Sequence, residues 1–125
     1  SIVDISSLLR AMSDDAMDMV NLKIGRLGGI SKTRLLRDIC VSSGVAVTIE
    51  DSWGSDVVTS AVAHLAHSTP AHARFTASDF NSYTSLSTAI GAPVRIEGTM
   101  VAPNGVGLGI ELIEDNLGSA CLDVN

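Results

Sequence analysis

Three short segments of the sequence place ionisable or aromatic side chains directly after runs of apolar, β-branched residues. Lys23 ends the first run, within VNLKIG, and Glu50 and Asp51 end the second, within TIEDSW, where Trp53 follows. Asp79 comes shortly after the third run, RFTA. In parallel α/β proteins, functional groups gather at the carboxyl ends of strands, which share one rim. We therefore expect these side chains to lie close together.

Lys23 is the first candidate for chemistry, because a charged group in a buried strand is costly unless it has a partner or a role. Period-2 alternation puts Asn21 and Lys23 on one face of the strand, with Val20, Leu22 and Ile24 on the other. On the polar face Lys23 could serve as a general base. Alternatively, it extends to solvent or pairs with a structural carboxylate.

The second segment combines two acids with the only tryptophan of the chain. Because Glu50 and Asp51 are adjacent in a strand, they point to opposite faces, so only one can face a cavity. A carboxylate beside Trp53 would suit an ammonium group, through an ion pair and a cation–π contact. The alternative is an acidic first helical turn with a tryptophan that packs.

The elements that must position these side chains alternate between helical and strand patterns. The spacing of apolar residues predicts helices over 1–17, 31–44 and 55–69, and strands over 18–24, 45–50 and 72–77. Helix caps are predicted at Ser1 or Asp4, at Ser31 and at Ser55, and Gly44 is predicted to end the second helix. The GRLGG segment is predicted to be a turn. This alternation indicates a parallel sheet covered by helices, either doubly wound or part of a (β/α)8 barrel.

Composition limits the remaining possibilities. A chain of 125 residues with 46% apolar residues suits one packed domain, and a net charge of −6 argues against nucleic acid as a partner. No apolar stretch is long enough to span a membrane, and no secretory signal is present. Cys40 and Cys121, far apart in apolar surroundings, are expected to be reduced thiols of a cytoplasmic protein. The histidines His64 and His67 lack matching acidic ligands, which disfavours a metal site.

Three segments, taken in order, resemble a known family. NLKIGRLGGISKTRLLRDI, VAVTIEDSWGSDVVTSAVAHLAHSTP and APNGVGLGIE are similar to the C-terminal part of the enolase superfamily, in the mandelate racemase/muconate lactonizing enzyme group. Within that group, the second segment is most similar to cis-3-hydroxy-L-proline dehydratases and proline betaine epimerases. The resemblance covers nearly the whole chain, and its motifs are specific together but weak singly.

The resemblance implies a modified (β/α)8 barrel with a separate capping domain. Residues 1–80 would supply about strands six to eight of the barrel with their helices, and 81–125 a tail that packs back on the capping region. In such enzymes a base removes the proton α to a substrate carboxylate, and Mg²⁺ stabilises the resulting enediolate. Lys23 matches the catalytic lysine of the sixth strand. The Mg²⁺ ligands match no residue here and are expected upstream of Ser1. We therefore expect this chain to be a fragment, a partial gene product or one chain of a larger assembly.

The same resemblance implies a small carboxylate substrate that carries an ammonium group, in a complete protein that forms homo-oligomers. We favour Asp51 over Glu50 as the inward carboxylate, since it is closer to the loop, and expect Asp51 and Trp53 to hold the substrate cation. Asp79 is a lesser candidate. The reaction would be dehydration or epimerisation of a hydroxyproline-type amino acid. The alternatives are an acid-sugar dehydratase or dipeptide epimerase of the superfamily, or a non-catalytic half-barrel.

Overall fold

The computed structural model describes residues 2–51, 53–119 and 121–122. Up to the third strand, the helices and strands alternate as the sequence predicts. Their bounds are α1 (Ile5–Ser13), β1 (Met19–Lys23), α2 (Ile24–Leu27), α3 (Ile30–Ser42), β2 (Ala46–Glu50), α4 (Asp56–His67) and β3 (Arg74–Ala77). Only the short helix α2 was not expected.

The strands form one parallel sheet in the order β1-β2-β3. β1 and β2 pair without a break from Met19 opposite Ala46 to Lys23 opposite Glu50. The central strand β2 has a fully buried core residue in Ile49, whereas every residue of β3 is exposed. Because the strands are parallel, their carboxyl ends form a single edge, as the sequence predicts.

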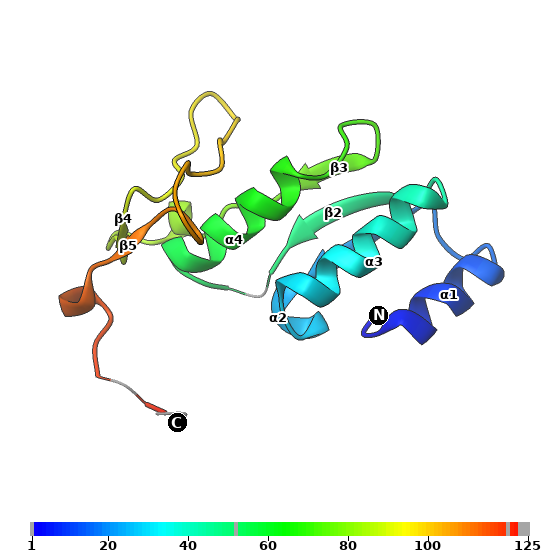
Figure 1. Cartoon of the computed structure of the whole chain (residues 1–125), viewed down its shortest axis with the longest axis horizontal. Helices are drawn as coiled ribbons and strands as arrows, with labels where there is room; N and C mark the ends of the chain where they lie inside the picture. Colours follow the sequence, from blue (N-terminus) through cyan, green and yellow to red (C-terminus); the bar gives the residue numbers. More distant parts are fainter. Residues whose placement is uncertain (1, 52, 120, 123–125) are drawn as a thin grey trace.

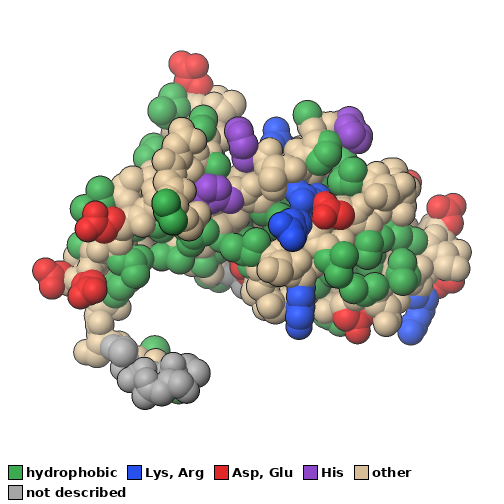
Figure 2. Space-filling view, viewed as in Figure 1, with side chains coloured by type: hydrophobic (Ala, Val, Ile, Leu, Met, Phe, Trp, Pro, Cys, Tyr) green, Lys and Arg blue, Asp and Glu red, His purple; other side chains and the backbone are tan. Residues whose placement is uncertain are grey.

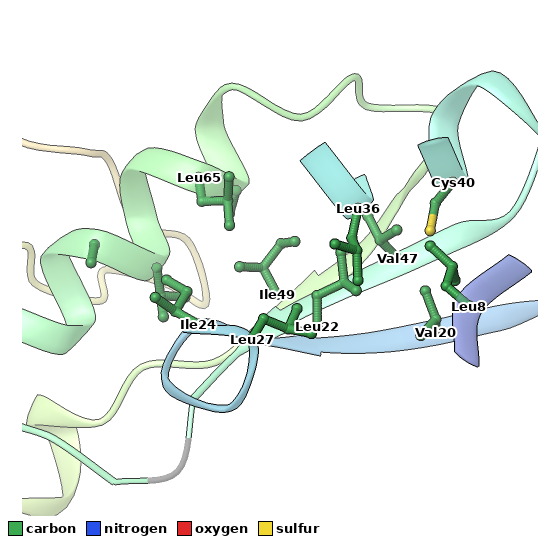
Figure 3. Packing of buried hydrophobic residues seen from close by; sticks show 13 residues of the cluster. Leu8, Val20, Leu22, Ile24, Leu27, Leu36, Cys40, Val47, Ile49 and Leu65 are labelled. Carbon is green, nitrogen blue, oxygen red and sulfur yellow. The ribbon is translucent and has the colours of Figure 1, made fainter. Parts of the chain in front are cut away.

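Helices α3 and α4 lie side by side over one face of the sheet (Figure 1). The core lies between these layers, and Figure 3 shows Ile49 of β2 between Leu36 of α3 and Leu65 of α4. At the other end of the cluster, Leu8 of α1 lies near Val20 of β1. Aliphatic side chains fill this core, and each contributes about 1.5–3 kcal/mol when it is fully buried.

The alternation predicted for β1 is confirmed. Val20 and Leu22 are buried toward the helices, whereas Asn21 is exposed and Lys23 is partly buried on the opposite face. Ile24, predicted to continue the strand, instead begins α2. The lysine therefore sits at the last position of the strand, where the backbone changes from extended to helical.

The connection between β1 and α3 differs from the predicted simple turn. After the single turn of α2, Gly28 and Gly29 adopt φ angles of +83° and +115°, which favour glycine and reverse the chain. Because α3 begins at once, its N-cap is Gly29 and not Ser31. The other predicted caps are confirmed in position: Asp4 caps α1 with a capping box, and Ser55 precedes α4 without a side-chain hydrogen bond. The alternative cap at residue 1 lies outside the described residues.

In the described part of the chain after β3, the elements are all short, as predicted. They are η1 (Asn81–Tyr83), β4 (Ala89–Ile90), β5 (Glu111–Leu112) and η2 (Glu114–Asn116), and β4 pairs with β5 in antiparallel fashion. Figure 1 shows this pair beside the amino end of α4. Farther along α4, Nε2 of His64 lies 3.0 Å from the backbone oxygen of Leu108. The tail thus contacts α4 near its amino end and again at His64.

Asp56 forms the first of these contacts. Its side chain accepts hydrogen bonds from Nδ2 of Asn81 at 3.0 Å, from Oγ of Ser87 at 2.7 Å, and from the amides of Thr88 at 2.7 Å and Ala89 at 3.1 Å. Burial opposes the charge, but the hydrogen bonds outweigh it and leave the pKa of Asp56 below its ordinary value. This carboxylate therefore joins the tail to the barrel segment.

The surface combines polar regions with exposed apolar side chains. Figure 2 shows hydrophobic side chains gathered over α1 and the adjoining part of α3, where Leu9 and Leu35 are about half exposed. Both cysteines are free thiols, as expected; Cys40 is fully buried and Cys121 is exposed. Among the described residues, no helix has the length and apolar character needed to cross a membrane.

Candidate functional site

The carboxyl edge of the sheet brings together polar residues from all three strands. Lys23 ends β1 and pairs in register with Glu50, which ends β2. Ser78 directly follows β3, and its amide donates to the backbone oxygen of Ile49 at 3.1 Å. Side chains on the same face at this edge are therefore neighbours across the strands, although they are far apart in the sequence.

Lys23 and Glu50 form an ion pair, with Nζ of the lysine 2.7 Å from Oε1 of the glutamate. Both side chains are partly exposed, at 23% and 22%. The hydrogen bond from Lys23 lowers the pKa of Glu50, and it outweighs partial burial, which acts in the opposite direction. Glu50 is therefore ionised at neutral pH and holds the lysine at the edge of the sheet.

Ser78 extends this pair to the third strand. Its Oγ donates to Oε2 of Glu50 at 3.2 Å. Glu50 therefore binds Lys23 through one carboxylate oxygen and Ser78 through the other, which fixes the orientation of the carboxylate. Lys23, Glu50 and Ser78 thus form one connected group of side chains across the three strands.

Asp51 occupies a different position from the one that we favoured. The carboxylate that shares a face with Lys23 is Glu50, because the register pairs these two residues directly. Asp51 lies just beyond β2, and its Oδ2 accepts a hydrogen bond of 2.8 Å from the amide of Gly25 in α2. The sequence could not distinguish the two acids, since the choice depends on where β2 ends.

Trp53 follows the end of β2 and is 77% exposed. Its φ angle of +59° is in the left-handed region, an uncommon and strained conformation for a bulky residue. The indole contacts two aromatic rings, an edge-to-face Tyr83 at a centroid distance of 5.9 Å and a tilted Phe80 at 6.3 Å. Sequence reasoning missed both partners, which come from the segment after β3.

Asp79, the lesser candidate, belongs to a neighbouring arrangement. Its Oδ1 pairs with Nη1 of Arg95 in the tail at 3.2 Å, and its buried Oδ2 has no hydrogen-bond partner. Asp79, Arg95 and Ser78 help to line a cavity of about 480 Å³ between α4, β3 and residues 95–100. The sequence gave no indication that an arginine of the tail would reach this aspartate.

The described residues do not fit a magnesium site. They contain no group of three or more His, Cys, Asp or Glu side chains that could hold a metal ion. The carboxylates of Glu50, Asp51 and Asp79 each have another partner: a lysine, a backbone amide and an arginine respectively. Any metal of the complete protein therefore needs ligands from residues outside the described part of this chain.

Several known proteins are similar to this chain in sequence or in structure. A curated protein, cis-3-hydroxy-L-proline dehydratase from Roseibium aggregatum, is 50% identical over 113 residues, which are 90% of this chain and 31% of that protein. A crystal structure of a mandelate racemase/muconate lactonizing enzyme from Roseovarius nubinhibens ISM matches 94% of this chain and 32% of its own, with 34% identity and a TM-score of 0.89. An enolase superfamily member from the same organism, complexed with magnesium, matches the same shares with 30% identity and a TM-score of 0.88.

These matches define what the chain is. It spans about a third of the length of these relatives, and its three-stranded parallel sheet with covering helices is the C-terminal part of their barrel, as predicted. The family model described as enolase C-terminal domain-like matches residues 1–116. This chain belongs to the enolase C-terminal domain-like family.

Proposed function

We propose that this chain is the C-terminal part of a dehydratase that removes the α-proton of a hydroxyproline-type amino acid. The observation that carries the proposal is the ion pair of Lys23 and Glu50 at the carboxyl edge of the sheet. The 50% identity to cis-3-hydroxy-L-proline dehydratase supports the substrate class. Lys23 is the proposed acid/base, and Glu50 and Ser78 hold it in place.

Loss of water from a 3-hydroxy amino acid has definite requirements. The Cα–H and Cβ–O bonds break, a Cα=Cβ double bond forms, and hydroxide leaves with a proton as water. A base must take the α-proton, and an acid must supply a proton to the hydroxyl. Lys23 can perform one of these transfers at Nζ: as a neutral amine it accepts a proton, and as an ammonium it donates one.

Glu50 can stabilise the protonated form of Lys23. Its carboxylate lies 2.7 Å from Nζ of Lys23, so a newly protonated lysine has an ionised partner at once. The partial exposure of both side chains leaves room for a substrate to approach the pair. If a second acid protonated the opposite face of Cα instead, the configuration at Cα would invert and the protein would be an epimerase, with Lys23 still as one of its two acid/base groups.

The substrate cation would lie against the rim aromatics. Trp53, Tyr83 and Phe80 form one cluster at this edge, and the exposed face of Trp53 can accept an ammonium through a cation–π contact. The family resemblance also implies Mg²⁺, which when bound elsewhere in the complete protein would stabilise negative charge on the substrate carboxylate. The described residues of this chain hold no group of three or more His, Cys, Asp or Glu side chains that could bind it by themselves.

Turnover of cis-3-hydroxy-L-proline by the longest gene product that contains this chain tests the proposal. The chain has two lysines, so Lys32→Ala, on the exposed surface of α3, is a matched control for Lys23→Ala. We expect Lys23→Ala to lose at least about a hundredfold in kcat, and Lys32→Ala to keep wild-type activity. Water loss identifies a dehydratase, and inversion at Cα without water loss identifies an epimerase. Wild-type turnover by Lys23→Ala would show that Lys23 is not the acid/base.

A further inference from the structure

We propose that Asp51 is a positioning residue, which fixes the backbone immediately after Lys23 and does not hold the substrate cation. This inference rests on the proposed role of Lys23 as acid/base. Its basis is the hydrogen bond of 2.8 Å from the amide of Gly25 to Oδ2 of Asp51, which joins residues 26 positions apart. The bond connects the loop after β2 to the helical turn after β1.

The backbone at Lys23 needs such support because it changes direction there. Lys23 is both the last residue of β1 and the N-cap of α2, with φ −105° and ψ 116°, and its side chain makes no capping hydrogen bond. The first amides of a helix have no partner within the helix and need an acceptor from elsewhere. Asp51 supplies that acceptor to Gly25, two residues after the lysine.

The glycine at position 25 supports the same interpretation. Gly25 lies within α2 and is not among the residues of positive φ, so its backbone conformation alone does not call for glycine. A Cβ atom there would lie 2.9 Å from Oδ1 of Asp51, closer than side chains normally tolerate. Glycine at this position leaves space for the aspartate carboxylate.

Glu50 and Asp51 therefore contact two different parts of the Lys23 region. Glu50 holds the Nζ atom of Lys23, and Asp51 holds the backbone that follows it. Glu50 is the last residue of β2 and Asp51 follows it. The same neighbouring strand thus fixes both the ammonium group of Lys23 and the backbone after it. Accurate placement of this kind matters because a displacement of about 1 Å can cost about a hundredfold in rate.

Substitutions of Asp51 distinguish positioning from substrate binding. Asp51→Asn keeps a side-chain oxygen that can accept from Gly25 but removes the charge, whereas Asp51→Ala removes both. We expect Asp51→Ala to lower kcat about tenfold or more with little change in KM, and Asp51→Asn to restore most of the kcat. Asp18→Ala, an exposed aspartate that directly precedes β1, is the control and should behave as wild type. A raised KM in Asp51→Asn at unchanged kcat would instead show contact with the substrate cation.

A structural readout makes the test independent of the proposed function. Amide hydrogen exchange at Gly25 should be slow in the wild type and in Asp51→Asn, and at least about tenfold faster in Asp51→Ala. Unchanged protection in Asp51→Ala would overturn the positioning role even if Lys23 proves essential. If Lys23→Ala keeps full activity while Gly25 loses protection in Asp51→Ala, the proposed function fails, and Asp51 remains only a structural support of α2.

Discussion

Two carboxylates of this molecule, Glu50 and Asp56, have pKa values below the ordinary range for different physical reasons. The ion pair with Lys23 is the main cause at Glu50, and burial there opposes it. Asp56 is only 4% exposed, and burial is the largest influence on its pKa, but hydrogen bonds from uncharged donors outweigh that influence. A downward shift of the pKa thus arises from a charged partner in one region and from neutral partners in the other.

The difference indicates what each region can do. The partners of Asp56 include backbone amides of the tail, which cannot leave without undoing the attachment of the tail to α4. The main partner of Glu50 is a flexible side chain at a partly open edge, so the pair can separate without unfolding. A fully satisfied buried carboxylate suits structure, and a partly exposed ion pair suits proton transfer.

The largest effect on stability is expected at Asp56. Asp56→Ala would leave several buried donors of Asn81, Ser87 and the tail backbone without an acceptor, so we expect a loss of about 3 kcal/mol in the free energy of unfolding. Urea denaturation measures it, with the exposed Asp115→Ala as control at under about 0.5 kcal/mol. If Asp56→Ala and Asp115→Ala lower the free energy of unfolding equally, Asp56 does not have the structural role that distinguishes it here from Glu50.

Glu50 should show the opposite balance between stability and activity. Glu50→Gln leaves a hydrogen-bonding group but no charge beside Lys23, so we expect turnover to fall by about tenfold or more. Stability should change by less than about 1 kcal/mol, since the ion pair is partly exposed. Kinetics and denaturation of the same preparation test both parts. A loss of stability like that of Asp56→Ala, with full activity, would contradict the comparison.

Acid should weaken the attachment of the tail. Because the pKa of Asp56 is lowered on folding, its contribution is complete above the unfolded pKa of about 4 and is lost as pH falls through the lower folded value. The difference in stability between wild type and Asp56→Ala should therefore be constant near neutral pH and shrink on acidification. Urea denaturation from pH 7 to pH 3 measures this difference. A difference that grows in acid would contradict the sign of the shift.

The smallest effect is expected at Trp53. If its exposed ring contributes a cation–π contact worth about 1 kcal/mol, Trp53→Ala should raise KM about fivefold, which is the same energy. Trp53→Phe keeps an aromatic face and should raise KM less. Steady-state kinetics with the proposed substrate measures both variants. An unchanged KM in Trp53→Ala would show that Trp53 does not bind the substrate ammonium. It would not affect the proposed role of Lys23.

Features that depend on local pattern could be predicted from the sequence. The alternation of β1 placed Lys23 on the polar face, and the parallel order of strands placed it at the same edge as Glu50. The resemblance to the enolase superfamily then identified the barrel segment. These predictions succeed because strand periodicity and the shared edge of parallel strands follow directly from backbone geometry.

Features that depend on long-range contacts could not be predicted. The choice between Glu50 and Asp51 depends on where β2 ends in register with β1. The contact of Trp53 with Tyr83 depends on how the chain returns after β3, for which the sequence has no short-range signal. The same holds for Asp79, because its partner Arg95 lies in the tail.

The most direct test of the central claim is exchange of the substrate α-proton with solvent, followed by proton NMR in D₂O. It isolates proton transfer from the loss of water. In the longest gene product that contains this chain, we expect the wild type and Lys32→Ala to replace the α-proton of cis-3-hydroxy-L-proline with deuterium or to eliminate water with its loss, and Lys23→Ala to do neither. Loss of the α-proton at the wild-type rate in Lys23→Ala would contradict the assignment of Lys23 as the acid/base.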